Sequence, residues 1–325
     1  MPKIELSKVT NVTLYTGNNS PWYCTCSCPC CSQRKREQHY EGTLDQANTF
    51  FEMLPNLKQL CILGNPDPTV DLDFCHQIMK MAMARKINVS FSTSGIGGKV
   101  SYEKLLKGIP NSIVDYVSVS IDTVDEQKLN ILKGRQYSLK NSVAGIKWLL
   151  DNGYTVKIQP TLWSSNFNDV EELMEYFIHI GVYWFTFHIG SLESGVSLPT
   201  HRHLTVNELH NVHDAIQSVV DRHKDKHISV RCPVIYPELW QNDETKWYCM
   251  KDSSITELMV TFTENGIKGT HAPILSVFNE QLSFYFEKGR NEIYLPSIKK
   301  DNFCPISKEL SGTNETFCCY ISRYW

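Results

Sequence analysis

The sequence predicts an α/β protein built on a mostly parallel sheet, and two observations lead to this prediction. First, over residues 4–225, short β-branched stretches alternate with amphipathic stretches of helical length. Second, this alternation repeats through six strand–helix units, a pattern that gives parallel strands joined by right-handed crossovers. A doubly wound open sheet and a barrel or partial barrel both fit the pattern. In either closure, chemistry takes place at the carboxyl ends of the strands.

Each predicted element has its own local signal. The strands are rich in β-branched residues and end at turn-forming residues; they cover residues 4–15, 57–63, 86–93, 114–121, 155–162 and 183–189. The helices cover residues 44–54, 71–85, 102–108, 139–152, 170–180 and 206–223. Thr43 and Gln46 have capping-box spacing, and Gly153 follows a helix as a typical C-terminal stop.

Composition narrows the class of protein. The chain has 325 residues, enough for one large domain or one domain with an appendage. Its net charge of −3 provides no basic surface for duplex nucleic acid. No stretch approaches the ~18 apolar residues of a membrane-spanning helix. Twelve cysteines without a secretion signal indicate a reducing compartment, and hence the cytoplasm.

The most informative stretch is CTCSCPCC at residues 24–31, directly after the first predicted strand. Cys24, Cys28 and Cys31 have the spacing C-x3-C-x2-C, whereas a register through Cys26 fails because position 33 is Gln33. Closely spaced thiolates on a short loop typically hold an iron–sulfur cluster, and three ligands leave one iron of a [4Fe–4S] cube open. A structural zinc site and a disulfide framework are the alternatives.

This spacing resembles the cluster motif of the radical S-adenosylmethionine (SAM) superfamily, although Cys30 stands where the family usually has an aromatic residue. The resemblance implies a partial (β/α)6 TIM-like barrel over residues 1–225, with a smaller irregular α+β extension over residues 226–325. It also implies a [4Fe–4S] cluster held by Cys24, Cys28 and Cys31, with SAM on the open iron. An external donor such as flavodoxin or ferredoxin would supply the electron that splits SAM into a 5′-deoxyadenosyl radical, which takes hydrogen from a substrate carbon.

The strand ends carry residues that could hold SAM. Asn65-Pro66-Asp67-Pro68 stands where the family has a Gly-Gly-Glu-Pro turn for the methionine amine; an ordinary Asx/Pro turn is the alternative. Hydroxyl and carboxyl groups suited to ribose follow the third and fourth strands, where a solvent-wetted sheet face is the alternative: Ser92, Ser94, Ser118, Ser120 and Asp122. Arg135 could pair with the methionine carboxylate, and Gln159 could reach adenine or substrate.

Substrate-facing residues are expected after the sixth strand. His188 and Glu193 are the catalytic candidates there, while structural roles are the alternative for both. The C-terminal third breaks the alternation and contains a predicted hairpin with its turn at Glu264-Asn265-Gly266.

A cysteine before a hairpin resembles the SPASM or twitch extension of peptide-modifying relatives. This resemblance implies a second iron–sulfur cluster or metal site, for which the candidates are Cys249, His271, Cys304 and Cys318. His271 stands where the extension has a cysteine, and buried structural thiols are the alternative.

Three functions remain open at the sequence level. The first is a radical SAM enzyme, an oxidoreductase or transferase, that modifies a peptide or protein. The second is a radical SAM enzyme for a small metabolite or nucleotide. The third is a non-catalytic iron–sulfur or zinc-binding protein.

Overall fold

The computed structural model describes residues 3–18, 26, 28–29, 40–63, 67–134, 137–190, 202, 204–235, 257–271, 283–286, 292–294 and 317–324. These residues are organised around one sheet of eleven strands. In spatial order the strands are β15 (Ser283–Tyr285), β14 (Gly266–His271), β13 (Glu257–Thr263), β2 (Asn11–Tyr15), β5 (Gln59–Ile62), β6 (Asn88–Thr93), β7 (Val114–Val119), β8 (Val156–Ile158), β10 (Trp184–Thr186), β12 (Ser229–Ile235) and β17 (Phe317–Tyr324).

The middle of this sheet is parallel. Every neighbouring pair from β13 to β12 runs in parallel, and the six predicted strands follow one another in chain order within it. Only the outer pairs, β13 with β14, β14 with β15, and β12 with β17, are antiparallel. The predicted parallel α/β architecture is therefore confirmed.

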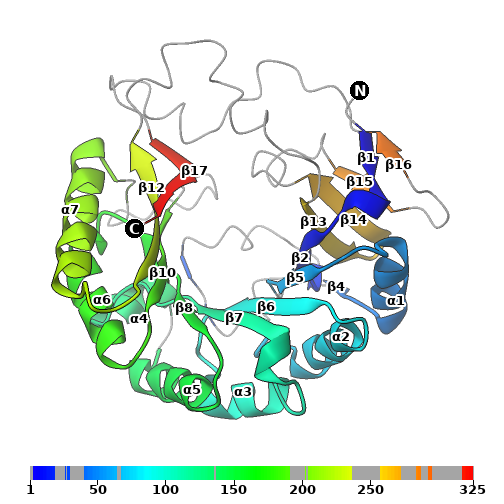
Figure 1. The fold of residues 1–325 in the computed structure, drawn as a ribbon, viewed down its shortest axis with the longest axis horizontal. Coiled ribbons are helices and arrows are strands. Elements are labelled where there is room, and N and C mark those ends of the chain that lie inside the picture. The colour runs from blue at the N-terminus through cyan, green and yellow to red at the C-terminus, as the bar shows by residue number, and fades with distance from the viewer. Residues whose placement is uncertain are drawn as a thin grey trace, which may run out of the picture.

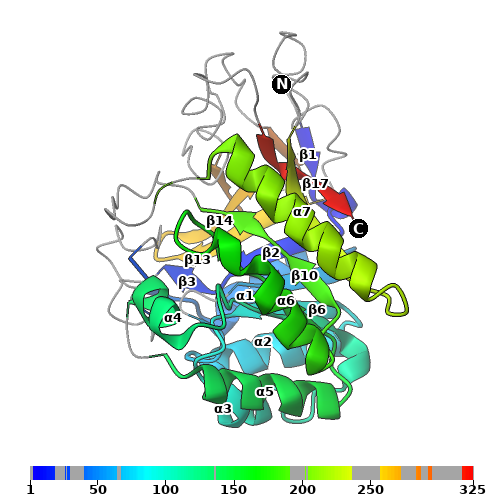
Figure 2. The ribbon, with the colours of Figure 1, turned by 90° about the vertical axis from the view of Figure 1, so that its left-hand side faces the viewer.

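Helices cover the convex side of the sheet, which curls into an open arc rather than a closed ring (Figure 1). They are α1 (Leu44–Met53), α2 (Leu72–Ala84), α3 (Gly98–Leu105), α4 (Glu126–Lys133), α5 (Leu139–Asp151), α6 (Val170–His179) and α7 (Val206–Arg222). Strands β12 and β17 form one arm of the arc and β13 to β15 form the other (Figure 1). Seen from the side, α7, α6 and α5 follow one another from top to bottom on the flank that faces the viewer (Figure 2). This open arc is the partial TIM-like barrel that the sequence predicted.

Short elements complete the described fold. Three 3-10 turns lie at Leu6–Lys8, Asn111–Ile113 and Phe167–Asp169. Three small two-stranded sheets join β1 (Lys3–Glu5) to β16 (Glu292–Tyr294), β3 (Gly17–Asn18) to β4 (Tyr40–Glu41), and β9 (Thr161–Leu162) to β11 (His188–Ile189).

The alternation of side chains along the strands separates an apolar layer from a polar one. Phe91 and Val117 are fully buried and join the same apolar cluster as Leu105 and Ile146 of the outer helices. Because successive strand residues point to opposite faces, the intervening residues, such as Ser92, point into the concave side of the arc. The inner wall is therefore the polar surface of the barrel.

The predicted strands 4–15 and 183–189 are each divided in two, and the predicted helix 102–108 is α3 at Gly98–Leu105. Three further details differ from the sequence-based elements. Helix α4 was not predicted, although Asp125 caps its N-terminus and Gly134 ends it with a φ of 65°. Strand β12 continues the parallel sheet beyond residue 225, where the alternation was expected to stop. The predicted strand 155–162 is divided into β8 and β9, because Pro160 between them has no N–H to continue the ladder.

Candidate active site at the carboxyl ends of the strands

The cysteine loop leaves the sheet at the carboxyl end of β2, as predicted. Its base is closed by the β3–β4 pair, in which Gly17 opposes Glu41 and Asn18 opposes Tyr40. Cys24 and Cys31 lie outside the described residues. Between them, Cys28 is half-buried, whereas Cys26 is 5% exposed and belongs to the apolar core. Of these two thiols, Cys28 is therefore the one placed at a surface that a ligand can reach.

A buried cation stands near this loop. Lys133 Nζ lies 2.8 Å from Asp122 Oδ2 and 3.0 Å from Ser120 Oγ. Burial by itself would lower the pKa of Lys133, but the negative charge of Asp122, with further contributions from Cys28, Tyr137 and Cys26, outweighs burial and raises it above its ordinary value. A hydrogen bond with Cys26 and burial raise the pKa of Cys28 well above its ordinary value, and the positive charge of Lys133 opposes them only in part. The described surroundings therefore favour the neutral thiol of Cys28, and Lys133 is the group there that favours a thiolate.

Asp67 anchors the turn after β5 rather than extending into open space. Its Oδ1 accepts hydrogen bonds from Thr69 N at 2.9 Å and from Thr69 Oγ1 and Thr93 Oγ1, both at 2.7 Å. Its Oδ2 accepts from the backbone N–H of Ser94. The carboxylate therefore ties the turn after β5 to the end of β6, and its direct contribution to the site is to hold this turn in place.

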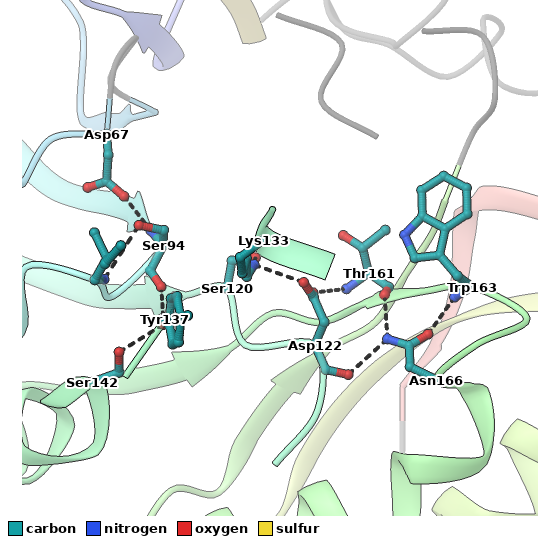
Figure 3. Close-up of polar contacts among 11 residues, drawn as sticks. Asp67, Ser94, Ser120, Asp122, Lys133, Tyr137, Ser142, Thr161, Trp163 and Asn166 are labelled. Atoms are coloured by element: carbon teal, nitrogen blue, oxygen red, sulfur yellow. Dashed lines mark hydrogen bonds and ion pairs between the residues drawn. The ribbon is translucent and has the colours of Figure 1, made fainter. Parts of the chain in front are cut away.

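A second group fixes the loop after β6 (Figure 3). Tyr137 donates its hydroxyl proton to the carbonyl oxygen of Ser94, and Ser142 Oγ lies 2.8 Å from Tyr137 Oη. At Gly95 the φ of +77° and a clash of any Cβ with Val119 leave room only for glycine. The predicted Ser94 is thus held by contacts that the sequence did not reveal.

Asp122 is the centre of a third group (Figure 3). Besides the ion pair with Lys133, its Oδ1 accepts from Thr161 N at 2.8 Å. Asn166 donates to the backbone oxygens of Asp122 and Thr161 at 2.9 and 3.0 Å. Since Ser120 N also donates to Thr93 O at 2.8 Å, the groups at β6, β7 and β9 form one polar edge.

A fourth group faces the inside of the barrel. Ser118 Oγ donates to Gln159 Oε1 at 2.5 Å, and Gln159 Nε2 lies 2.7 Å from His188 Nε2. Ser92 opposes Ser118 in the β6–β7 register. The imidazole of His188 is exposed to solvent, but protein surrounds it within the arc. This enclosure and the positive charges of Lys157 and Arg231 lower the pKa of His188 to about 4, so the ring is neutral at pH 7.

Seven of the predicted site residues lie outside the described residues: Cys24, Cys31, Asn65, Arg135, Glu193, Cys249 and Cys304. Of His271 and Cys318 the structure gives the backbone, on β14 and β17, which lie on opposite arms of the arc (Figure 1). Within the described part of the chain, no three His, Cys, Asp or Glu side chains gather as a metal site. No disulfide joins the five described cysteines, which are Cys26, Cys28, Cys61, Cys75 and Cys232.

The comparisons agree with this arrangement. Residues 23–177 match the family model of the radical SAM superfamily, so this part of the chain is similar to a radical SAM domain. No curated protein sequence matches the chain significantly.

Solved structures with the same fold include Streptococcus suis SuiB bound to S-adenosylmethionine (TM-score 0.61, 16% identity, 78% of this chain and 59% of SuiB). Another is SuiB bound to precursor peptide SuiA (TM-score 0.60, 15% identity, 78% and 58%). A third is native anSMEcpe with bound AdoMet (TM-score 0.54, 15% identity, 68% and 64%). The chain thus spans less than two thirds of the length of these structures, and at such identities they share its fold alone. In the described residues, no helix is long and apolar enough to span a membrane.

Proposed function

We propose that this chain reductively cleaves SAM at a [4Fe–4S] cluster and modifies a peptide or protein substrate by hydrogen abstraction. The observation that carries the proposal is the polar edge at the strand ends, which adjoins the half-buried Cys28 and lies within the radical SAM domain. The fold shared with SuiB, a protein whose structure is known with a precursor peptide, supports a peptide substrate.

Cys24, Cys28 and Cys31 would hold the cluster, which together with SAM supplies the 5′-deoxyadenosyl radical when bound. Asp67 ties Thr69 to the end of β6, and backbone groups of the preceding Asn65 and Pro66 are proposed to bind the methionine amine. The ribose hydroxyls are proposed to bind among Ser92, Ser94, Ser118, Ser120 and Asp122, and Arg135 is proposed for the methionine carboxylate.

The substrate side is formed by the inner wall. A neutral, solvent-accessible imidazole at His188 can accept a proton or a hydrogen bond from substrate, and its contact with Gln159 orients the ring. Glu193 follows the same strand in the sequence and is proposed as its acidic neighbour. The concave wall excludes bulk water on its strand side, which protects a reactive intermediate.

Two parts of the proposal concern the remaining chain. Residues 226–325 are proposed as the extension that completes the substrate side. Because His271 on β14 and Cys318 on β17 lie on opposite arms of the arc, a second cluster with Cys249 and Cys304 would include one of them at most. An external flavodoxin or ferredoxin in a reducing, cytoplasmic compartment is the proposed electron source, in accord with five described cysteines that form no disulfide.

A small metabolite is the second candidate substrate, favoured by two cations, Lys157 and Arg231, on the inner wall. A peptide and a metabolite both require SAM cleavage, so the first experiment addresses this shared step.

The test is anaerobic reconstitution with iron and sulfide, reduction with dithionite, and chromatographic measurement of 5′-deoxyadenosine and methionine. We expect both products from the wild type and from Cys75→Ala, a matched control at a thiol buried in α2. We expect none from Cys28→Ala. Product formation by Cys28→Ala, or none by a wild type that contains the cluster, would overturn the proposal.

A further inference from the structure

A single hydrogen bond decides which nitrogen of the His188 ring carries the proton. His188 Nε2 lies 2.7 Å from Gln159 Nε2, which is the contact of the ring within the described residues. Enclosure by the surrounding protein lowers the pKa of His188 to about 4, so the ring is neutral at pH 7 and carries one proton. In a neutral imidazole one nitrogen donates and the other accepts, and the partners of the ring decide which is which.

The orientation of the Gln159 amide follows from its contact with Ser118. Ser118 Oγ lies 2.5 Å from Gln159 Oε1, a separation that O–H···O bonds reach and that is shorter than the about 2.7–3.2 Å of N–H···O bonds. Ser118 is 1% exposed, and its hydroxyl has no other partner among the described residues. If the amide were reversed, the buried hydroxyl proton of Ser118 would lack an acceptor there, which is costly.

Gln159 therefore donates to His188, and the ring proton lies on Nδ1. With Oε1 bonded to Ser118, the amide nitrogen of Gln159 faces His188 Nε2, which must then be the unprotonated acceptor. Protonation of Nε2 would set two N–H groups against each other. Within the part of the chain that the structure describes, Nδ1 has no hydrogen-bond partner, and the ring is exposed inside the arc. His188 thus presents an N–H donor to the concave side.

Backbone hydrogen bonds fix the main chain around this donor. The N–H of Gln159, directly after β8, donates to Val119 O on β7 at 2.9 Å. The N–H of His188, on β11, donates to Pro160 O at 2.9 Å. The third residue, Ser118, lies within β7 itself. Because a donor that is held in place before binding loses little freedom on binding, it can recognise an acceptor at a defined position.

We propose that Ser118 and Gln159 are positioning residues that hold His188 in its Nδ1–H form, so that this N–H donates a hydrogen bond to a carbonyl oxygen of the substrate. The proposal rests on the proposed function, in which the substrate occupies the concave side. His188 then binds substrate and does not transfer a proton. In a peptide the acceptor is an amide carbonyl, and in a small metabolite it is a carboxylate oxygen. A substrate group that only donates hydrogen bonds, such as an ammonium group, is discriminated against there.

The experiment is proton–nitrogen correlation NMR of the full chain with isotope-labelled histidine at pH 7, with His188→Asn to identify the His188 signals. Rings protonated at Nδ1 and at Nε2 give different correlation patterns. We expect the Nδ1–H form to dominate in the wild type and in Gln127→Leu, a matched change at an exposed glutamine of α4. Gln159→Leu removes the donor to Nε2, and Ser118→Ala releases the amide to reverse. In both variants the Nε2–H form should therefore appear.

Acceptor binding is tested by adding N-methylacetamide for an amide carbonyl, sodium acetate for a carboxylate, or methylammonium chloride as a control that only donates. We expect N-methylacetamide, acetate or both to shift the Nδ1 signal of His188 more than that of His179, which is exposed on α6. Methylammonium should leave it unchanged. A shift with N-methylacetamide supports a peptide carbonyl, and a shift with acetate alone supports a carboxylate.

An Nε2–H ring in the wild type overturns the inference, as does an Nδ1 signal that responds to neither acceptor more than His179 does. An unchanged Nδ1–H form in both Gln159→Leu and Ser118→Ala would contradict the positioning role of these two residues. If the wild type cleaves SAM and shows an Nε2–H ring, the donor site fails while the proposed function stands. If the Nδ1–H ring is present but SAM is not cleaved, the proposed function fails instead.

Discussion

At the scale of single residues, Lys157 shows how a charge can be retained inside an α/β barrel. Burial lowers its pKa to about 8, and Arg231 adds to this effect, whereas the nearby Cys61 opposes it. The ammonium form is therefore destabilised in the native protein relative to the unfolded chain. Under the proposed function the inner wall faces substrate, and residues there can lower stability and still be useful for binding.

Lys157→Met should raise the free energy of unfolding at pH 7 above that of the wild type. A pKa lowered from its ordinary 10.5 to about 8 corresponds to about 3 kcal/mol, of which the lost cation–π contacts offset about 1 kcal/mol. The unfolded chain binds more protons between pH 8 and 10.5, so the wild type should gain stability relative to the variant as pH rises through that window. Urea unfolding at pH 7 and at pH 10 measures both effects. A variant less stable than the wild type at pH 7 would contradict this account of Lys157.

Asp67 illustrates the opposite case, a carboxylate that is fully engaged. Asp67→Ala removes the acceptor for Thr69, Thr93 and Ser94 and leaves buried hydroxyls without it, which should cost about 2–4 kcal/mol. Asp214→Ala, at an exposed carboxylate of α7, is the control and should change stability by less than about 0.5 kcal/mol. Chemical denaturation of the wild type, Asp67→Ala and Asp214→Ala measures the three free energies of unfolding. Equal stabilities would mean that the turn after β5 is held by other contacts.

The sequence predicted some residues of the candidate site and missed others, and the reason is physical. Asp67, Ser94, Ser120 and Asp122 follow strands directly, so strand periodicity alone located them at one edge. Lys133 was missed because its partner Asp122 lies across a loop and a helix that was not predicted. Lys157 was missed because a lysine inside a strand pattern does not reveal which face it occupies until the register is known.

At the scale of elements, α1 links the radical SAM domain to the C-terminal hairpin. Thr43 and Gln46 form the predicted capping box, with Gln46 N donating to Thr43 Oγ1 at 3.2 Å and Thr43 N donating to Gln46 Oε1 at 3.0 Å. The amide nitrogen of Gln46 then donates to Thr263 O at 2.9 Å, beside the hairpin turn. Phe50 of the same helix packs edge-on against Phe262, with ring centroids 6.1 Å apart.

Gln46→Ala should therefore destabilise both the start of α1 and the β13–β14 hairpin. Losing the cap and the hairpin contact is expected to cost about 1–2 kcal/mol, since each is a partly exposed hydrogen bond. Native-state hydrogen exchange should speed up in β13 and β14 as well as at the start of α1. Gln77→Ala, at an exposed position of α2, serves as the control and should leave both regions unchanged. Unchanged exchange in β13 and β14 would show that the hairpin does not depend on α1.

At the scale of the whole molecule, the sheet crosses the expected boundary at residue 225. Strand β12 extends the sheet beside β10, and β13 joins β2 in parallel on the other arm. The Asn-Gly turn predicts the β13–β14 hairpin but not its position in the sheet, because a parallel pairing between residues 11 and 257 has no local sequence signal. For the same reason, an open arc and a doubly wound sheet could not be separated by alternation alone.

The central claim is that one face of this molecule holds a [4Fe–4S] cluster through Cys24, Cys28 and Cys31. The most direct measurement is the iron and sulfide content of anaerobically prepared protein, for the wild type and for a variant with all three cysteines changed to alanine. The account predicts that the variant loses about four irons and four sulfides per chain relative to the wild type. A residual of about four irons in the variant would indicate a second cluster. Equal iron in the two proteins, or zinc in place of iron in the wild type, would contradict the account.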